Sequence, residues 1–253
     1  MRSRKLGDLS FQEIRDYLSE LAFPRVILPI GALEAHGPHL PLTTDTICAT
    51  GLAIRISEML DALVLPPVHY GVVNSLAAYP GSLTIRESVF REFLIDILEG
   101  LASDGFTEIV ILNGHGGNRP ALDSIAKEFP KRKPDIRLVL IHWWILGKEI
   151  GKKILKNGIG HAGSDETALV VAFAPNLVLY DKIPAEDQVT ILKEGFRAYP
   201  LPGSILLYEE GDEFTKIPDE KLSNQLIDSL VTKTVALVEE AFQTLRKNLY
   251  KPK

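Results

Sequence analysis

Short apolar runs recur along the chain and predict strands. They lie at Val26–Ile30, Ala62–Val68, Glu108–Leu112 and Arg137–Ile141, and Gly, Pro or other turn residues follow them. The runs are almost continuously hydrophobic instead of alternating with polar residues, which is the pattern of strands that are covered on both faces. They therefore predict a mostly parallel sheet that is buried between helices.

Segments with helical periodicity fill the spaces between these runs. In Glu87–Asp104 the apolar residues form one stripe, and Gly105 is placed to end the helix. The other expected helices are Thr46–Leu60, Pro120–Phe129, Ala168–Phe173 and Glu220–Leu249. This alternation of strands and helices favours an α/β fold, a three-layer αβα sandwich.

The chain shows no sign of division into domains. Between Lys182 and Asp219, Gly, Pro and acidic residues are scattered and the periodicity is weak. We expect this stretch to be an irregular excursion that serves as a lid or as an oligomer contact. Because there is no internal repeat, low-complexity tract or linker, we expect one domain over residues 1–253.

The composition disfavours several classes of protein. The 253 residues are 45% hydrophobic with a net charge of −5, so nothing attracts the chain to nucleic acid or to an anionic membrane. No apolar run is long enough to span a membrane, and Met1–Ser10 lacks the apolar core of a secretory signal. The single Cys48 excludes an internal disulfide and fits a reducing compartment. We therefore expect a cytoplasmic protein.

The first segment with candidate chemistry follows the run Val26–Ile30. Glu34 and His36 are two residues apart, so in extended backbone their side chains project to the same side. Asp45 comes just before an expected helix and can turn back toward the sheet edge. This mixture of imidazole and carboxylate suits a divalent ion. The alternative is a polar loop in which Asp45 only stabilises a helix N-terminus.

The second segment, Asn113–Asn118, also lies between an expected strand and a helix. Its glycine spacing differs from that of a dinucleotide-binding loop, and it lacks the Gly-Lys-Ser/Thr ending of a P-loop. Three glycines around His115 indicate backbone that approaches another group closely. The alternative is a glycine turn with an incidental histidine.

The third segment contains His161, Asp165 and Glu166 before an apolar helix. Ser164 is a plausible N-cap, and acidic residues in a first helical turn are common stabilisers. His161 is harder to explain as part of a cap. Together the three segments place imidazoles and carboxylates at the sheet edge, as in a one- or two-metal hydrolase.

Other features carry less weight. No Gly-x-Ser-x-Gly elbow is present, which disfavours a serine hydrolase. His69 and His142 lie within apolar runs and are expected to be structural, and His39 has no assignment. Ser82 in a turn and Trp143 after a strand are candidates for substrate contacts.

Taken in order, the three segments resemble the creatininase family of metal-dependent amidohydrolases. The resemblance implies a three-layer α/β sandwich that binds two divalent ions per subunit, Zn, Mn or Fe, and forms homo-oligomers, often hexamers. It implies that Asp45 bridges both ions, that Glu34 and His115 complete one site and that His36 holds the other. Trp143 matches a pocket tryptophan of the family.

The expected reaction is hydrolysis of a C–N amide bond by a metal-activated water. His161 is the candidate that protonates the departing nitrogen or stabilises the tetrahedral intermediate, while Ser82 and Trp143 orient the substrate. The substrate is a small molecule or a peptide. The competing class is a non-catalytic protein that uses the same residues as a structural metal site.

Two departures from creatininase itself concern the second ion and the substrate. Gly117 stands where creatininase has a glutamate ligand, so Glu166 is the candidate replacement. Residues 157–160 before His161 contain no aromatic side chain, whereas creatininase has a tryptophan on that loop. Family members with the Gly-Gly form include a formamidopyrimidine-nucleotide deformylase and a peptidase that trims a cofactor precursor.

Overall fold

A parallel four-stranded sheet forms the centre of the fold. A computed structural model describes residues 2–156, 158–182, 189–192, 206–209 and 216–247. The strand order is β2-β1-β3-β4, with β1 Arg25–Ile30, β2 Leu63–Val64, β3 Glu108–Asn113 and β4 Arg137–His142. This confirms the expected sheet.

The strands are aligned so that their carboxyl ends are level. Ile30 pairs with Asn113, and Asn113 in turn pairs with His142. The segments that follow β1, β3 and β4 therefore start at the same edge of the sheet. Ligand sites in open α/β sheets lie at this edge.

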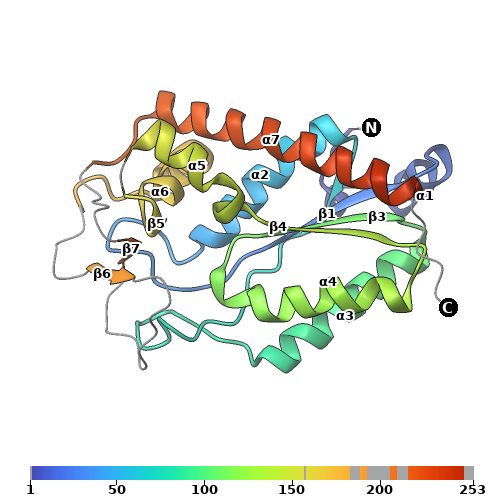
Figure 1. Ribbon diagram of the computed structural model, residues 1–253, viewed down its shortest axis with the longest axis horizontal. Coiled ribbons are helices and arrows are strands. Elements are labelled where there is room, and N and C mark those ends of the chain that lie inside the picture. Colours follow the sequence, from blue (N-terminus) through green and yellow to red (C-terminus); the bar gives the residue numbers. More distant parts are fainter. Residues whose placement is uncertain (1, 157, 183–188, 193–205, 210–215, 248–253) are drawn as a thin grey trace.

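Helices cover both faces, which confirms the three-layer sandwich (Figure 1). Ile27, Val110 and Ile141 face one layer, and Leu28 and Ile111 face the other. The first layer contains α2 Thr44–Leu60, α5 Trp143–Leu155, α6 Ser164–Phe173 and α7 Glu220–Lys247. The second contains α1 Phe11–Glu20, α3 Glu87–Asp104 and α4 Arg119–Arg132. Among the described residues, the short 3₁₀ helices are η1 Leu6–Asp8, η2 Gly116–Asn118 and η3 Pro175–Leu177.

Several expected boundaries were wrong. The run Ala62–Val68 contains only the two-residue β2, because Pro66 and Pro67 have no N–H to donate to a strand ladder. Val68 still touches β1 through an isolated bridge to Ile30. The helix α2 begins at Thr44, so Asp45 lies inside its first turn and not before it.

The stretch Lys182–Asp219 was expected to be irregular, and this was wrong in part. It contains β6 Val189–Leu192 and β7 Leu206–Glu209, which pair in parallel, and β7 pairs antiparallel with β5 Gly160–His161. This small sheet lies at the left of Figure 1, at the end of the molecule where α6 begins. Residues 183–188, 193–205 and 210–215 are outside the described residues, as are residues 248 and 249 of the expected last helix.

Candidate metal centre

Six polar side chains from the three segments come together at the carboxyl edge of the sheet. The described residues supply three groups of potential ligands whose ligand atoms lie within 4.8 Å of one another: Glu34, His36 and His161; Glu34, Asp45 and His115; His36, Asp45 and Glu166. All six are buried or nearly so; His36 is 0% exposed. Burial of so many ionisable groups is costly unless they are paired with one another or with an ion.

His115 follows β3 and faces two carboxylates. Its Nε2 donates a hydrogen bond to the carbonyl of Val72 at 3.0 Å. In the neutral ring the lone pair is therefore on Nδ1, which is 3.1 Å from Glu34 Oε1 and 3.0 Å from Asp45 Oδ2. Metal-binding histidines are commonly held in this way, with one nitrogen donating to a carbonyl and the other facing the ion.

His36 has the same arrangement with the nitrogens exchanged. Its Nδ1 donates to the carbonyl of Glu34 at 3.0 Å, which leaves Nε2 toward the carboxylates. That Nε2 is 3.1 Å from Asp45 Oδ1 and 3.6 Å from Glu166 Oε2. Glu166 Oε2 also accepts a hydrogen bond from the backbone N–H of Ala162 at 2.7 Å.

Asp45 lies between the two histidines, with Oδ1 toward His36 and Oδ2 toward His115. Oδ2 is buried, and the polar atom that faces it is His115 Nδ1 at 3.0 Å. Imidazole nitrogens and carboxylate oxygens gathered in this way are the ligands that Zn²⁺ and related divalent ions take. The residues present therefore fit divalent ions that share Asp45.

His161 in β5 is oriented toward the same cluster. Its Nε2 donates to the carbonyl of Ala35 at 2.8 Å, and its Nδ1 is 3.5 Å from Glu34 Oε1. Its ring centroid is 4.2 Å from that of His36. His161 can therefore exchange a proton at Nδ1 beside the carboxylates or bind an ion there.

The charges of the cluster shift its pKa values strongly. Burial opposes the charged form of His36, but Asp45 and Glu166 outweigh it and raise the pKa to about 10. Burial likewise opposes the charged form of His115, yet Glu34 and Asp45 raise its pKa. Burial raises the pKa of Glu166 to about 8. Burial and the neighbouring His36 lower the pKa of His161 to about 4, so this imidazole is neutral at neutral pH.

The two candidate substrate residues are both buried. Ser82 Oγ accepts a hydrogen bond from Ala35 N–H at 3.0 Å and so helps to hold the loop between Glu34 and His36. Trp143 is the first residue of α5 and belongs to the buried core that also includes residues of α2 and α7. Its indole Nε1 is buried, and no described residue accepts a hydrogen bond from it.

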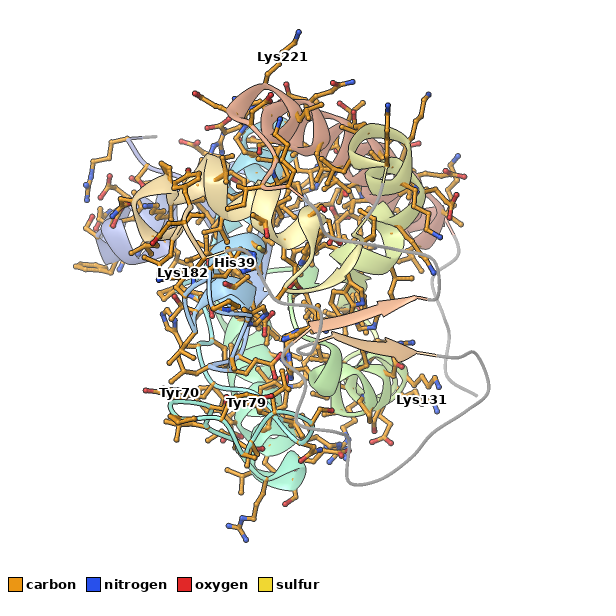
Figure 2. All side chains as sticks on the ribbon, turned by 90° about the vertical axis from the view of Figure 1, so that its left-hand side faces the viewer. His39, Tyr70, Tyr79, Lys131, Lys182 and Lys221 are labelled. Atoms are coloured by element: carbon orange, nitrogen blue, oxygen red, sulfur yellow. The ribbon has the colours of Figure 1, made fainter. Side chains whose placement is uncertain are left out.

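The remaining expectations have mixed outcomes. His69 is exposed, so its structural assignment was wrong, whereas Cys48 is buried in the core as expected. His39, next to α2 in Figure 2, is buried, and its Nε2 is 2.9 Å from Thr167 Oγ1. Ser164 is the first residue of α6, and Gly163 is its N-cap.

Sequence reasoning assigned no role to two asparagines that support the centre. Asn118 is fully buried, donates to the carbonyl of Gly31 at 3.0 Å and accepts from Val72 N–H at 2.9 Å. Asn113 contacts the backbone of His115 on both sides. Their place beside His115 in one motif was the available signal, but their partners are backbone groups that only the fold brings near.

The glycines around His115 do allow a close approach, as the sequence indicated. A Cβ on Gly114 would collide with the carbonyl of Asp45, and one on Gly117 would collide with the carbonyl of Val72 and with His115 Nε2. A Cβ on Gly116 would meet no heavy atom within 4 Å. A side chain at position 117 is therefore incompatible with the present position of His115.

We expect Gly117→Ala to lower the free energy of unfolding by about 1–3 kcal/mol, the range for overpacking. It should also weaken metal binding, because the new Cβ displaces the Val72 carbonyl that orients His115. Urea unfolding and a Mn²⁺ titration measure the two effects. Gly116→Ala is the matched control, and equal behaviour of the two variants would contradict this account.

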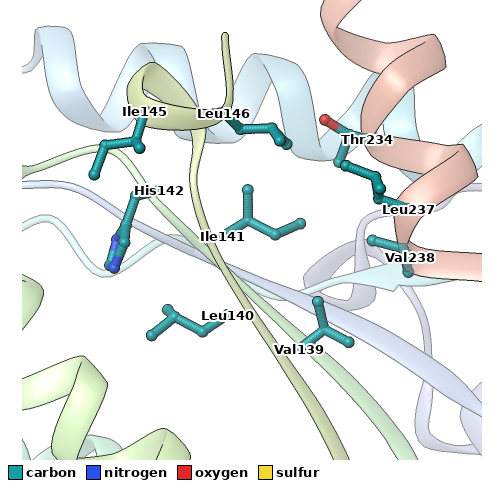
Figure 3. A pocket seen from close by; sticks show the side chains of 9 residues that line it. All are labelled: Val139, Leu140, Ile141, His142, Ile145, Leu146, Thr234, Leu237 and Val238. Atoms are coloured by element: carbon teal, nitrogen blue, oxygen red, sulfur yellow. The ribbon is translucent and has the colours of Figure 1, made fainter. Parts of the chain in front are cut away.

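A pocket in the described part of the chain lies away from this cluster. It has a volume of about 290 Å³ and contains none of the six cluster residues (Figure 3). Its lining is almost wholly apolar and comes from β4, α5 and α7: Val139, Leu140, Ile141, His142, Ile145, Leu146, Thr234, Leu237 and Val238. With one titratable side chain, it offers little chemistry.

Curated relatives of this chain act on several substrates. It is 32% identical to a mycofactocin precursor peptide peptidase of Mycolicibacterium smegmatis over 168 residues, 63% of this chain and 62% of that protein. It is 28% identical to creatinine amidohydrolase of Pseudomonas putida over 175 residues, 62% of this chain and 67% of that protein. It is also 26% identical to a 2-amino-5-formylamino-6-ribosylaminopyrimidin-4(3H)-one 5'-monophosphate deformylase of Methanothermobacter thermautotrophicus over 246 residues, 87% of this chain and 91% of that protein. The chain thus matches less than two thirds of the length of the first of these relatives.

A solved structure and a family model also match the chain. A solved mutant creatininase of the Zn–Zn type superposes with a TM-score of 0.80 at 22% identity, covering 96% of this chain and 99% of that one. The family model for creatininase, described as creatinine amidohydrolase, matches residues 7–238. The chain belongs to the creatininase family of amidohydrolases.

Proposed function

We propose that the protein is a metal-dependent amidohydrolase that hydrolyses a C–N amide bond. The observation that carries this proposal is the pair of ligand groups that share Asp45. In each group a histidine donates a hydrogen bond from one ring nitrogen to a backbone carbonyl, and its other ring nitrogen faces carboxylates. Family membership supports the same chemistry.

Two divalent ions per chain are proposed, one held by Glu34, Asp45 and His115 and one by His36, Asp45 and Glu166. Solved creatininases of this fold in a Zn–Zn type and in a Mn form support divalent ions of this kind, and Fe is a third candidate. Bound at this centre, such ions would lower the pKa of a water molecule and polarise a carbonyl group. Glu166 here supplies the carboxylate that Gly117 cannot.

His161 is the proposed acid–base residue. Because its pKa is lowered to about 4, its Nδ1 is free of a proton at neutral pH. It would accept the proton that the attacking water loses and then donate that proton to the departing nitrogen. The hydrogen bond from Nε2 to the carbonyl of Ala35 fixes the ring for this transfer. Ser82 and Trp143 are proposed to orient the substrate, since the Ser82 hydroxyl can donate to a further acceptor and the Trp143 indole can bind a substrate carbonyl.

The substrate class is tested by a small panel. Creatinine, a formamidopyrimidine nucleotide and short peptides represent a cyclic amide, a formamide and a peptide bond. We expect hydrolysis of the formamide or the peptide to exceed that of creatinine, because Gly117 and the loop at 157–160 differ from creatininase. Metal-loaded protein that hydrolyses none of them, and that unfolds when a chelator removes its ions, would instead be the metal-stabilised binding protein.

Metal binding should release protons. Without an ion the pKa of His36 is raised to about 10, so that ring is protonated at pH 7. Glu34 and Asp45 also raise the pKa of His115, which favours its protonated ring. An ion needs the lone pair of each ring and must displace these protons, so affinity should rise with pH up to about 10. Calorimetric titration of Zn²⁺ in two buffers with different ionisation enthalpies measures the release. Equal apparent enthalpies in the two buffers would show that no proton leaves.

The cellular location, oligomeric state and partners of the enzyme are proposed from the sequence alone. We propose a cytoplasmic homo-oligomer, a hexamer by the family resemblance, whose partners are its substrates and neither nucleic acid nor membrane. No helix of the described ranges is long and apolar enough to cross a membrane.

A further inference from the structure

The side chain of Asn113 uses every hydrogen-bonding position that an amide has. It is the last residue of β3 and is 0% exposed. Its Nδ2 donates to the carbonyl of His115 at 2.8 Å and to His142 Nδ1 at 3.0 Å. Its Oδ1 accepts from His115 N–H at 3.1 Å and from Asn118 Nδ2 at 3.3 Å.

The chemistry of these partners allows only one orientation of the amide. The carbonyl of His115 can only accept, and its N–H can only donate. Asn118 Nδ2 is itself fixed as a donor, because it also donates to the carbonyl of Gly31. If the amide were reversed, its N–H₂ group would face the two donors that now bind Oδ1. Its oxygen would face the carbonyl of His115, which can only accept. Such unsatisfied groups are costly in a buried site.

His142 completes the arrangement from the neighbouring strand. It is the last residue of β4, directly paired with Asn113, and it lies at one end of the residues drawn in Figure 3. Because Asn113 Nδ2 only donates, His142 Nδ1 is the acceptor and its proton is on Nε2, 3.4 Å from Asp123 Oδ1. Burial lowers the pKa of His142, which favours the neutral ring that this role requires.

We propose that Asn113 and His142 are positioning residues of the metal centre, with Asn113 holding both backbone groups of His115 and His142 holding the Asn113 amide. The proposal rests on the proposed function, since His115 is placed there as a metal ligand. The ring of His115 is fixed at one end by the Val72 carbonyl and at its backbone by Asn113. These two restraints set where Nδ1 lies relative to Glu34 and Asp45.

Asn113→Asp and His142→Phe test the proposal separately. Asn113→Asp keeps the acceptor for His115 N–H but places an oxygen against the carbonyl of His115. His142→Phe keeps an aromatic ring but removes the acceptor that holds the amide. His69→Phe, which changes an exposed histidine in the same way, is the matched control.

Co²⁺ is the probe, because its visible absorption reports ligand geometry and its binding requires no substrate. We expect Asn113→Asp to weaken Co²⁺ binding by about 10- to 100-fold, the usual effect of losing a partner of a metal ligand, and to change the spectrum. His142→Phe should change both in the same direction to a smaller extent, and His69→Phe should change neither.

Unfolding curves for each variant keep a loss of fold apart from a loss of positioning. Folded variants that bind Co²⁺ with the wild-type affinity and spectrum would overturn the positioning roles and leave the proposed function intact. Wild-type protein that binds no Co²⁺ would overturn the proposed function itself.

Discussion

Replacing Asp45 with asparagine should lower turnover about a thousand-fold or more and reduce the metal content at both sites. The carboxylate lies between His36 and His115, and each of its oxygens faces one of them. Asparagine has almost the same shape, but it loses the charge and presents an N–H₂ group to one site. Loss of metal assistance worth several kcal/mol corresponds to a rate change of that size.

The control for this variant is Asp228→Asn on α7. Asp228 is exposed and forms a surface ion pair with Arg55, so its loss should change neither turnover nor metal content. Steady-state rates and elemental analysis of both variants give the comparison. An Asp45→Asn protein with wild-type metal content would contradict the shared ligand.

Glu108→Gln should lower the free energy of unfolding by about 3–5 kcal/mol, the cost of breaking a buried ion pair from one side. Glu108 begins β3 at the edge of the sheet opposite the metal centre and is 0% exposed. Its carboxylate accepts from Arg25 Nε at 2.8 Å and from Arg246 Nε at 2.6 Å. Arg246 is on α7, so the ion pair between Glu108 and Arg246 connects the last helix to the sheet.

Thermal or urea unfolding measures the effect, with Asp228→Asn again as the comparison. That variant breaks an exposed pair and should cost less than about 1 kcal/mol. Glu108→Gln should leave turnover per folded molecule unchanged, because the centre lies at the other end of β3. Equal losses of stability in the two variants would show that Glu108 is not a structural anchor.

The expected strands could be identified because burial on both faces leaves a plain apolar run. In the described part of the chain, the α-helices α1 and α5 were missed for physical reasons. The helix α5 begins directly after β4, so the apolar run from Leu138 to Leu146 hides the boundary. The helix α1 has one buried residue, Tyr17, and its clearest signal is the capping box formed by Ser10 and Glu13. That the whole chain is one domain stays a prediction.

The cluster of candidate ligands was predictable because imidazole and carboxylate side chains at strand ends carry a chemical signal of their own. The groups that orient these ligands carry none: the carbonyls of Val72 and Ala35 belong to ordinary residues that only the fold brings to His115 and His161. Asn113 was visible in the motif, but its partner His142 is on the next strand. Sequence patterns therefore located the candidate centre more readily than the groups that orient its side chains.

Elemental analysis of the full-length chain tests the central claim most directly. The protein would be stripped with a chelator, loaded with Mn²⁺ or Zn²⁺, separated from free ions and analysed for bound metal. The shared position of Asp45 between two ligand groups predicts two ions per chain. A chain that retains one ion or none under saturating conditions would contradict the dinuclear centre.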